Sequence, residues 1–204
     1  MGPLGIDAAD VATRSLPFVV LALLPLVAVA ATALAKALVV TAALRTGLSA
    51  ERLLPGPVVW MLGFLLAGIV MLPTFEGAWT AFGQPEVDLA AVGRAALEPW
   101  LEFLGRHAAP EERAFLAELT GRSTGDPLVV VAGFFLTELA QGLHMAVAIL
   151  APFLAVDLLV AQALVLASMT NVPAQVVSLP IKLALFLAAD GVHLLVRGFV
   201  ESYP

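Results

Sequence analysis

The sequence predicts an all-α membrane protein made of two helical hairpins with a small acidic helical insertion between them. Of the 204 residues, 61% are hydrophobic and 13% are charged, at a mean hydropathy of +0.99. A soluble domain has about 25% charged residues. Long charge-free runs recur along the chain, and one acidic segment interrupts them. These observations place the chain in a membrane or inside a membrane complex.

The first hairpin is expected over residues 15–75. Residues 15–35 carry no charge, and we expect this helix to continue to Leu44 with a kink at Pro25. Lys36 lies between apolar residues. Its long stem either carries the ammonium group to an interface or places it in a buried ion pair inside an assembly.

A turn over residues 45–57 joins this helix to a second one, expected over residues 58–72 and ended by Pro73. Arg45 and Arg52 lie in the turn. Cytoplasmic loops carry an excess of such residues. We therefore expect the turn inside the cell and the protein's insertion on the outer side.

The insertion is expected over residues 76–126, where apolar residues recur at three- and four-residue spacing. Pro99 and Pro110 should divide it into short, water-exposed helices. It carries nine acidic residues and four arginines. The acidic residues are Glu76, Glu86, Asp88, Glu98, Glu102, Glu111, Glu112, Glu118 and Asp126. The arginines are Arg94, Arg106, Arg113 and Arg122.

The second hairpin is expected over residues 127–203. Residues 128–166 are almost continuously apolar, but Thr137, Gln141 and His144 share one helix face and Glu138 lies beside it. A polar stripe at membrane depth normally faces protein or a watery cavity. It predicts hydrogen-bonded packing between subunits, with a proton or ion relay as the alternative.

A charge-free run over residues 158–181 is interrupted by Asn171 and two prolines. We expect two helices joined by a non-helical elbow at residues 168–173. The last helix is expected over residues 176–199 and bent at Pro180.

Three charges accompany the elbow: Asp157, Lys182 and Asp190. Lys182 and Asp190 lie about 80° apart around a helix, since each residue turns it by about 100°. They cannot pair along one helix. We expect Lys182 to pair with Glu138 or Asp157.

No catalytic motif is complete. The chain has no cysteine, no H-E-x-x-H and no phosphate-binding glycine loop, so we expect no enzyme activity, metal or cofactor. Asp157 and Asp190 offer only the residue types of an aspartyl dyad, and Ser168, Asp190 and His193 those of a triad. The net charge of −6 argues against nucleic acid as a partner.

An ordered series of motifs resembles the FliP/SctR family of type III secretion export-gate proteins. The series comprises Leu16-Pro17-Phe18, Thr32, Lys36, Leu44-Arg45, Pro55, Pro57, Met71, Pro73, Phe134-Phe135, Glu138-Leu139, Pro152-Phe153-Leu154, Asp157-Leu158, Val177 to Leu183, Leu187 and Asp190-Gly191. Their order and approximate spacing match from residue 15 to residue 203. Val192 stands where the family usually has tryptophan.

The resemblance implies a multi-pass protein of the bacterial inner membrane, with the insertion on the periplasmic side. It implies a pentameric ring of identical subunits, joined by smaller export-apparatus subunits and crossed by secreted proteins. The family's elbow carries three methionines that seal the pore; Met169, Thr170 and Asn171 occupy those positions here. Methionine suits this role because its unbranched thioether repacks easily.

Because each lies in or beside apolar sequence and needs a partner, we expect Lys36, Glu138, Asp157, Lys182 and Asp190 to be buried charges that support assembly. The alternative function is a small ion-coupled membrane carrier that uses Glu138, Asp157, Lys182 and Asp190. The first residues lack the basic region of a signal peptide, so we expect no cleavable leader. This favours the virulence-type, SctR-like branch over the flagellar one.

Overall fold

The computed structural model describes residues 8–51, 53–82 and 89–203. Arg52 of the expected turn and Glu86 and Asp88 of the expected insertion lie outside these ranges. The described residues form helices and connecting segments, so the all-α prediction is confirmed for them. The helices are α1 (Ala8–Ala30), α2 (Leu34–Gly47), α3 (Gly56–Phe82), α4 (Leu89–His107), α5 (Pro110–Thr120), α6 (Pro127–Leu166), α7 (Ala174–Ala188) and α8 (Gly191–Glu201).

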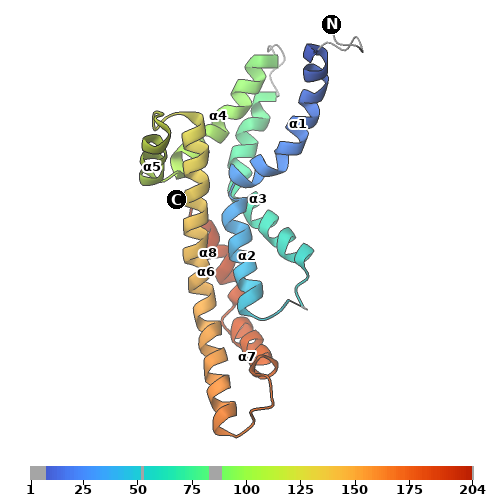
Figure 1. Ribbon diagram of the computed structural model, residues 1–204, viewed down its shortest axis with the longest axis vertical. Helices are drawn as coiled ribbons and strands as arrows, with labels where there is room; N and C mark the ends of the chain where they lie inside the picture. Colours follow the sequence, from blue (N-terminus) through green and yellow to red (C-terminus); the bar gives the residue numbers. More distant parts are fainter. Residues whose placement is uncertain (1–7, 52, 83–88, 204) are drawn as a thin grey trace.

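Helix α6 runs along most of the long axis of the molecule (Figure 1). It has 40 residues and covers the apolar run of residues 128–166, and Pro152 lies inside it without ending it. Asp126 begins it as the N-cap residue, and Pro127 follows in the first turn, where proline is favoured. Helix α2 packs along α6, while α4 and α5 lie at the end of α6 opposite the elbow.

The expected continuous helix up to Leu44 is wrong. The chain breaks after Ala30 and turns by 70° into α2, whereas Pro25 lies inside α1. Polar groups freed at the break find partners. The Thr32 hydroxyl donates to the Ala28 carbonyl (2.5 Å) and accepts from the Leu34 amide (3.3 Å).

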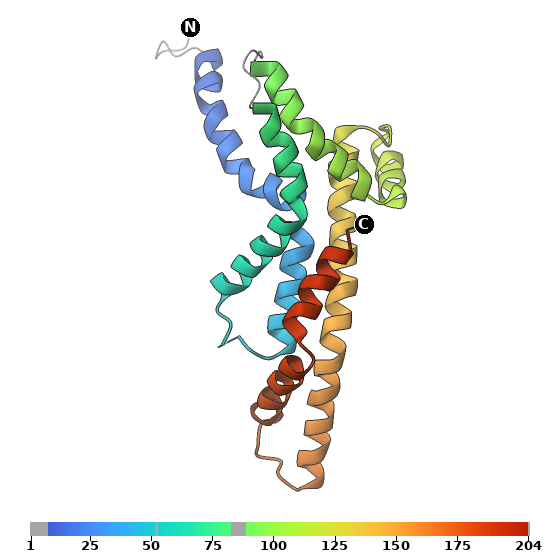
Figure 2. The same cartoon turned by 180° about the vertical axis from the view of Figure 1, so that it is seen from behind.

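Two prolines do not end their helices as predicted. Helix α3 runs through Pro73 to Phe82, and α4 contains Pro99. A proline inside a helix removes one hydrogen bond and kinks the axis, and Figure 2 shows α3 bent along its length. Pro110 does mark a boundary, because it occupies the first turn of α5.

The last helix is divided, which also differs from the prediction. Helices α7 and α8 meet at 63°, and the break lies at Asp190 and not at Pro180, which is inside α7. Asp190 adopts the left-handed conformation, with φ of 52°. Aspartate tolerates this region better than most residues do, so the chain turns there.

The core lies where α2 is enclosed by α3, α6 and the end of α8. Ala37, Val40, Leu66, Phe134 and Phe199 are fully buried there. By length and composition, α3 up to Thr80 and α6 are long and apolar enough to cross a membrane. Within the described ranges the number rises to four if each bent pair, α1–α2 and α7–α8, counts as one span.

Candidate functional site

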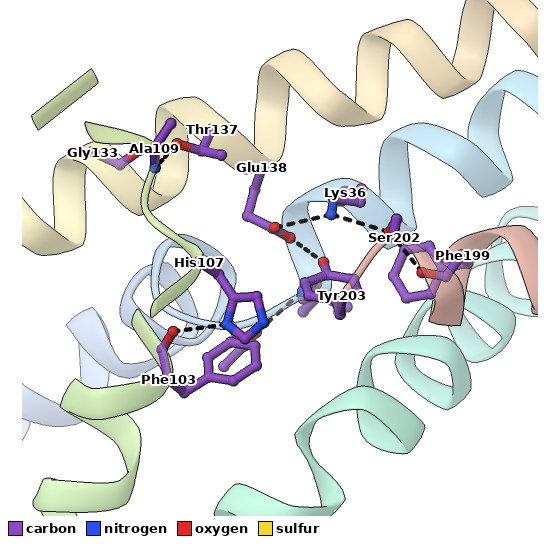
Figure 3. Close-up of polar contacts among 12 residues, drawn as sticks. Lys36, Phe103, His107, Ala109, Gly133, Thr137, Glu138, Phe199, Ser202 and Tyr203 are labelled. Atoms are coloured by element: carbon purple, nitrogen blue, oxygen red, sulfur yellow. Dashed lines mark hydrogen bonds and ion pairs between the residues drawn. The ribbon is translucent and has the colours of Figure 1, made fainter. Parts of the chain in front are cut away.

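Lys36 and Glu138 form a buried ion pair where α2 crosses α6 (Figure 3). Lys36 Nζ lies 3.2 Å from Glu138 Oε1, and the two side chains are 0% and 1% exposed. The interface alternative for Lys36 is therefore wrong for this chain, and the ion-pair alternative describes its geometry. Charges are kept in such a place only when each has a partner.

The segment after α8 completes this pair. The Tyr203 hydroxyl donates to Glu138 Oε2, and Lys36 Nζ donates to Ser202 Oγ at 3.3 Å. Lys36 Nζ also lies 3.6 Å from the centroid of the Tyr203 ring, in cation–π geometry. Three segments distant in sequence thus meet at one charge pair, as Figure 3 shows.

Close backbone approach places Lys36 opposite α6. A Cβ atom built on Gly142 would lie 3.2 Å from the Lys36 Cα. Small residues at a helix crossing allow such an approach. Thr137, one turn earlier, donates to the Gly133 carbonyl (2.8 Å) and accepts from the Ala109 amide (2.9 Å), which joins α6 to the α4–α5 connection.

The structure divides the expected polar stripe. Thr137 is buried inside the protomer, whereas Gln141 and His144 are exposed on α6. Packing of the stripe as a whole within the chain is therefore not observed. The exposed pair remains available to another subunit, which stays a prediction.

Lys182 pairs with Asp157, one of the two expected partners. Its Nζ lies 2.6 Å from Asp157 Oδ2 and 3.0 Å from Ser49 Oγ. The contact ties α7 to α6 and to the turn that follows α2. Glu138, the other expected partner, is taken by Lys36.

Asp190 lies apart from these pairs. Its Oδ1 lies 2.7 Å from His193 Nδ1 on the exposed start of α8, and its side chain is itself exposed. It is thus not a buried charge within the protomer. Asp157 is engaged by Lys182 and Asp190 by His193, so the geometry does not place the two carboxylates in a dyad.

The elbow is an exposed connection at the tip of the molecule (Figure 1). It covers residues 167–173 between α6 and α7, so the expected non-helical segment is confirmed. Met169 is 51% exposed, and Thr170 and Asn171 are also exposed. Ser168 has a positive φ of 58°, which produces a sharp reversal after α6.

Sequence reasoning missed Ser49, Ser202 and Tyr203. Tyr203 is the only tyrosine of the chain, and its place after a predicted helix in an apolar sequence was the available signal. Among the described residues, no group of three or more histidine, aspartate or glutamate side chains is arranged to hold a metal ion.

The fold and the site define a class: small helical proteins with helices of membrane-spanning length, held together by buried ion pairs. The FliP family model matches residues 18–199. The chain belongs to the FliP family, which confirms the resemblance.

Relatives carry both flagellar and secretion names. The flagellar biosynthetic protein FliP of Caulobacter vibrioides is 31% identical over 194 residues, which cover 90% of this chain and 73% of that protein. Yop proteins translocation protein R of Yersinia pestis is 30% identical, with 90% and 92% covered. The hypersensitivity response secretion protein HrcR of Ralstonia nicotianae is 28% identical, with 91% and 94% covered.

Proposed function

We propose that the chain is a core subunit of a type III protein secretion export gate. Membership of the FliP family is the observation that carries the proposal. The relatives are named for flagellar biosynthesis, translocation and secretion, and the chain spans most of their lengths. In this role the chain forms part of a protein-conducting channel in the bacterial inner membrane and performs no catalysis.

Uncovered apolar side chains support an assembled state. Large apolar residues on α1, α3 and α6 face outward, among them Phe18, Leu21, Met61, Trp79 and Leu159. A monomeric soluble protein rarely exposes so much contiguous apolar surface. We propose that lipid, sister copies and smaller export-apparatus subunits cover these faces, and that the copies form the pentameric ring typical of the family.

The elbow is proposed as the constriction of the pore. Its side chains are exposed, and the helices on both sides are joined through Lys182 and Asp157. Two flanking helices held together by an ion pair, with a flexible methionine side chain at their connection, suit a seal that yields to passing chains. Met169, Thr170 and Asn171 of each copy would line this constriction.

A membrane orientation can be proposed from Arg45 and the two ends of α6. We propose the insertion on the periplasmic side, since Arg45 marks the opposite, cytoplasmic turn. Figure 1 places α4 and α5 at one end of α6 and the elbow at the other. The elbow then lies toward the cytoplasm, where the entrance of an export channel belongs. The SctR-like branch remains our proposal, since relatives of both kinds match.

The size of the native particle tests the proposal. A tagged copy extracted from its own membranes in mild detergent should run as a large complex that contains several copies and small hydrophobic partners. A monomer that transports ions in liposomes would contradict the gate and favour the carrier. The comparisons give the carrier no support.

A further inference from the structure

We propose that Ser202 and Tyr203 form a latch that closes the buried Lys36–Glu138 pair against water and holds α8 in place. This latch segment follows α8 directly. Its role does not depend on the proposed function, because it is a property of the folded protomer.

The latch supplies hydrogen-bond partners to both buried charges. Lys36 offers three donors, and Glu138 two acceptor oxygens. Glu138 Oε1 receives Lys36, whereas Oε2 receives the Tyr203 hydroxyl. Lys36 Nζ also donates a hydrogen bond to Ser202 Oγ and makes a cation–π contact with the Tyr203 ring. Without the latch segment, both charges would keep only each other as partners in a buried place, which is costly.

A polar cavity borders Tyr203. It has a volume of about 280 Å³ and is lined by Tyr203, Phe103, His107, Glu102 and Arg106, among others. Neither Lys36 nor Glu138 is among the described residues that line this cavity. Tyr203 lines the cavity and also contacts both members of the pair, which is the position that a seal between them requires.

Aromatic packing holds the ring in that position. Tyr203 lies 5.5 Å from His107, 5.6 Å from Phe199 and 6.2 Å from Phe103, measured between ring centroids. Phe199 is fully buried at the end of α8. Aromatic pairs of this kind stabilise a protein by more than their buried area alone would. The Tyr203 ring is therefore part of the packed core.

The latch also restrains the far end of α8. Helix α8 otherwise packs mainly against α3 and α7, and it meets α7 at the Asp190 break. The latch fixes its far end to α2, α4 and α6 (Figures 2 and 3). Opening the latch would expose the pair to the cavity and free the far end of α8 from α2, α4 and α6, while α8 keeps its contacts with α3 and α7.

The two lysines of the chain report on this directly, since Lys36 and Lys182 are its only ones. The protein in native membranes is treated with a water-soluble N-hydroxysuccinimide acetate, and acetylation of each lysine is measured by mass spectrometry. Tyr203→Ala should raise the labelling of Lys36 by about tenfold or more, as expected when a closed state is weakened by about 1.4 kcal/mol. Labelling of Lys182 should stay unchanged.

Further variants separate sealing from unfolding. Tyr203→Phe keeps the ring and loses the hydroxyl, so Lys36 labelling should rise less. Glu201→Ala, at an exposed neighbouring position, should leave it at the wild-type level. If Tyr203→Ala raises the labelling of both lysines, the variant has unfolded and Tyr203→Phe decides. Lys36 labelling that is unchanged in Tyr203→Phe and does not rise selectively in Tyr203→Ala would overturn the latch.

Discussion

Lys182 Nζ on α7 lies 2.6 Å from Asp157 Oδ2 on α6, and the two side chains differ sharply in exposure. Lys182 is 1% exposed, whereas Asp157 is 34% exposed. The contact therefore joins a buried cation to a half-buried anion. Loss of either partner leaves a different charge behind, and the costs should differ.

The first prediction is that Asp157→Asn is more harmful than Lys182→Met. The asparagine variant strands a buried ammonium group, which costs about 3–5 kcal/mol. The methionine variant leaves a carboxylate on a side chain that is 34% exposed, although its Oδ1 atom is buried, so the loss should be smaller than for the fully buried ammonium group. Thermal unfolding in detergent, followed by size-exclusion chromatography, measures the order.

Glu102→Gln is the matched surface control, because Glu102 pairs with Arg106 on the exposed face of α4. It should change the unfolding temperature little. Equal losses for the two variants at the buried pair would show that water reaches Lys182 as readily as Asp157.

A second prediction concerns the Lys36–Glu138 pair. Lys36→Met should destabilise the protein by about 3–5 kcal/mol, since it strands the Glu138 carboxylate. The double variant Lys36→Met with Glu138→Met should recover much of this loss, because replacing both buried charges by apolar residues is often nearly neutral. A double-mutant cycle on unfolding in detergent gives the coupling. Additive losses would contradict a direct pair.

A third prediction concerns the helix crossing. Alanine is favoured over glycine in a helix by about 1 kcal/mol, yet Gly142→Ala should destabilise, because its Cβ would lie 3.2 Å from the Lys36 Cα. Gly105→Ala is the matched control, as that α4 glycine has no such neighbour within 4 Å. It should stabilise. A stabilising Gly142→Ala would show that α2 and α6 can separate without cost.

Helix identity could be predicted from the sequence, but several helix ends could not. Pro73 and Pro99 were expected to end helices and Pro180 to bend one, but all three lie inside helices, and the break near Pro180 falls at Asp190 instead. In an apolar setting a helix satisfies the backbone groups that water cannot, which offsets the hydrogen bond that proline removes. The chain breaks instead at Thr32 and Asp190. A hydroxyl partners the freed backbone groups at Thr32, and Asp190 tolerates a positive φ.

The sequence indicated which charged residues need partners, but not which residue pairs with which. A lysine in an apolar run needs a partner, and this reasoning left Glu138 and Asp157 as equal options for Lys182. The fold decides between them, because it brings Lys36 to Glu138 across the α2–α6 crossing. Tyr203 was missed since its contact requires α8 to return beside α6, which no local pattern shows.

A fourth prediction concerns the start of α6. Asp126 accepts from the Leu128 amide at 2.9 Å and from Arg122 Nη1 at 2.8 Å. The Arg122 hydrogen bond, and then that of the Leu128 amide, lower the pKa of Asp126. Its stabilising effect should therefore be present above the pKa of the unfolded state and be lost as the pH falls through the lower, folded-state value.

Amide hydrogen exchange at Leu128 measures this effect. Asp126→Ala should speed exchange there because the cap is lost, while Asp126→Asn should retain most of the protection, as asparagine also caps helices well. Glu118→Ala, on the exposed face of α5, should leave exchange at Leu128 unchanged. Protection that is the same for Asp126→Ala and the wild type would show that the cap does not hold this end.

The final prediction addresses the elbow. Met169→Ala should raise the leak of small molecules through the assembled gate, because the shorter side chain fills less of a constriction that several copies share. Thr170→Met with Asn171→Met should lower the leak, since flexible thioethers would replace polar groups at the same exposed positions. Leu154→Ala, on the outward side of α6 away from the elbow, is the control and should change nothing.

Leak is measured as dye uptake by cells that produce each variant at equal level. If Met169→Ala leaves uptake at the wild-type level, the elbow does not seal the pore. If the double methionine variant tightens it while Met169→Ala loosens it, side-chain volume at the elbow sets the seal.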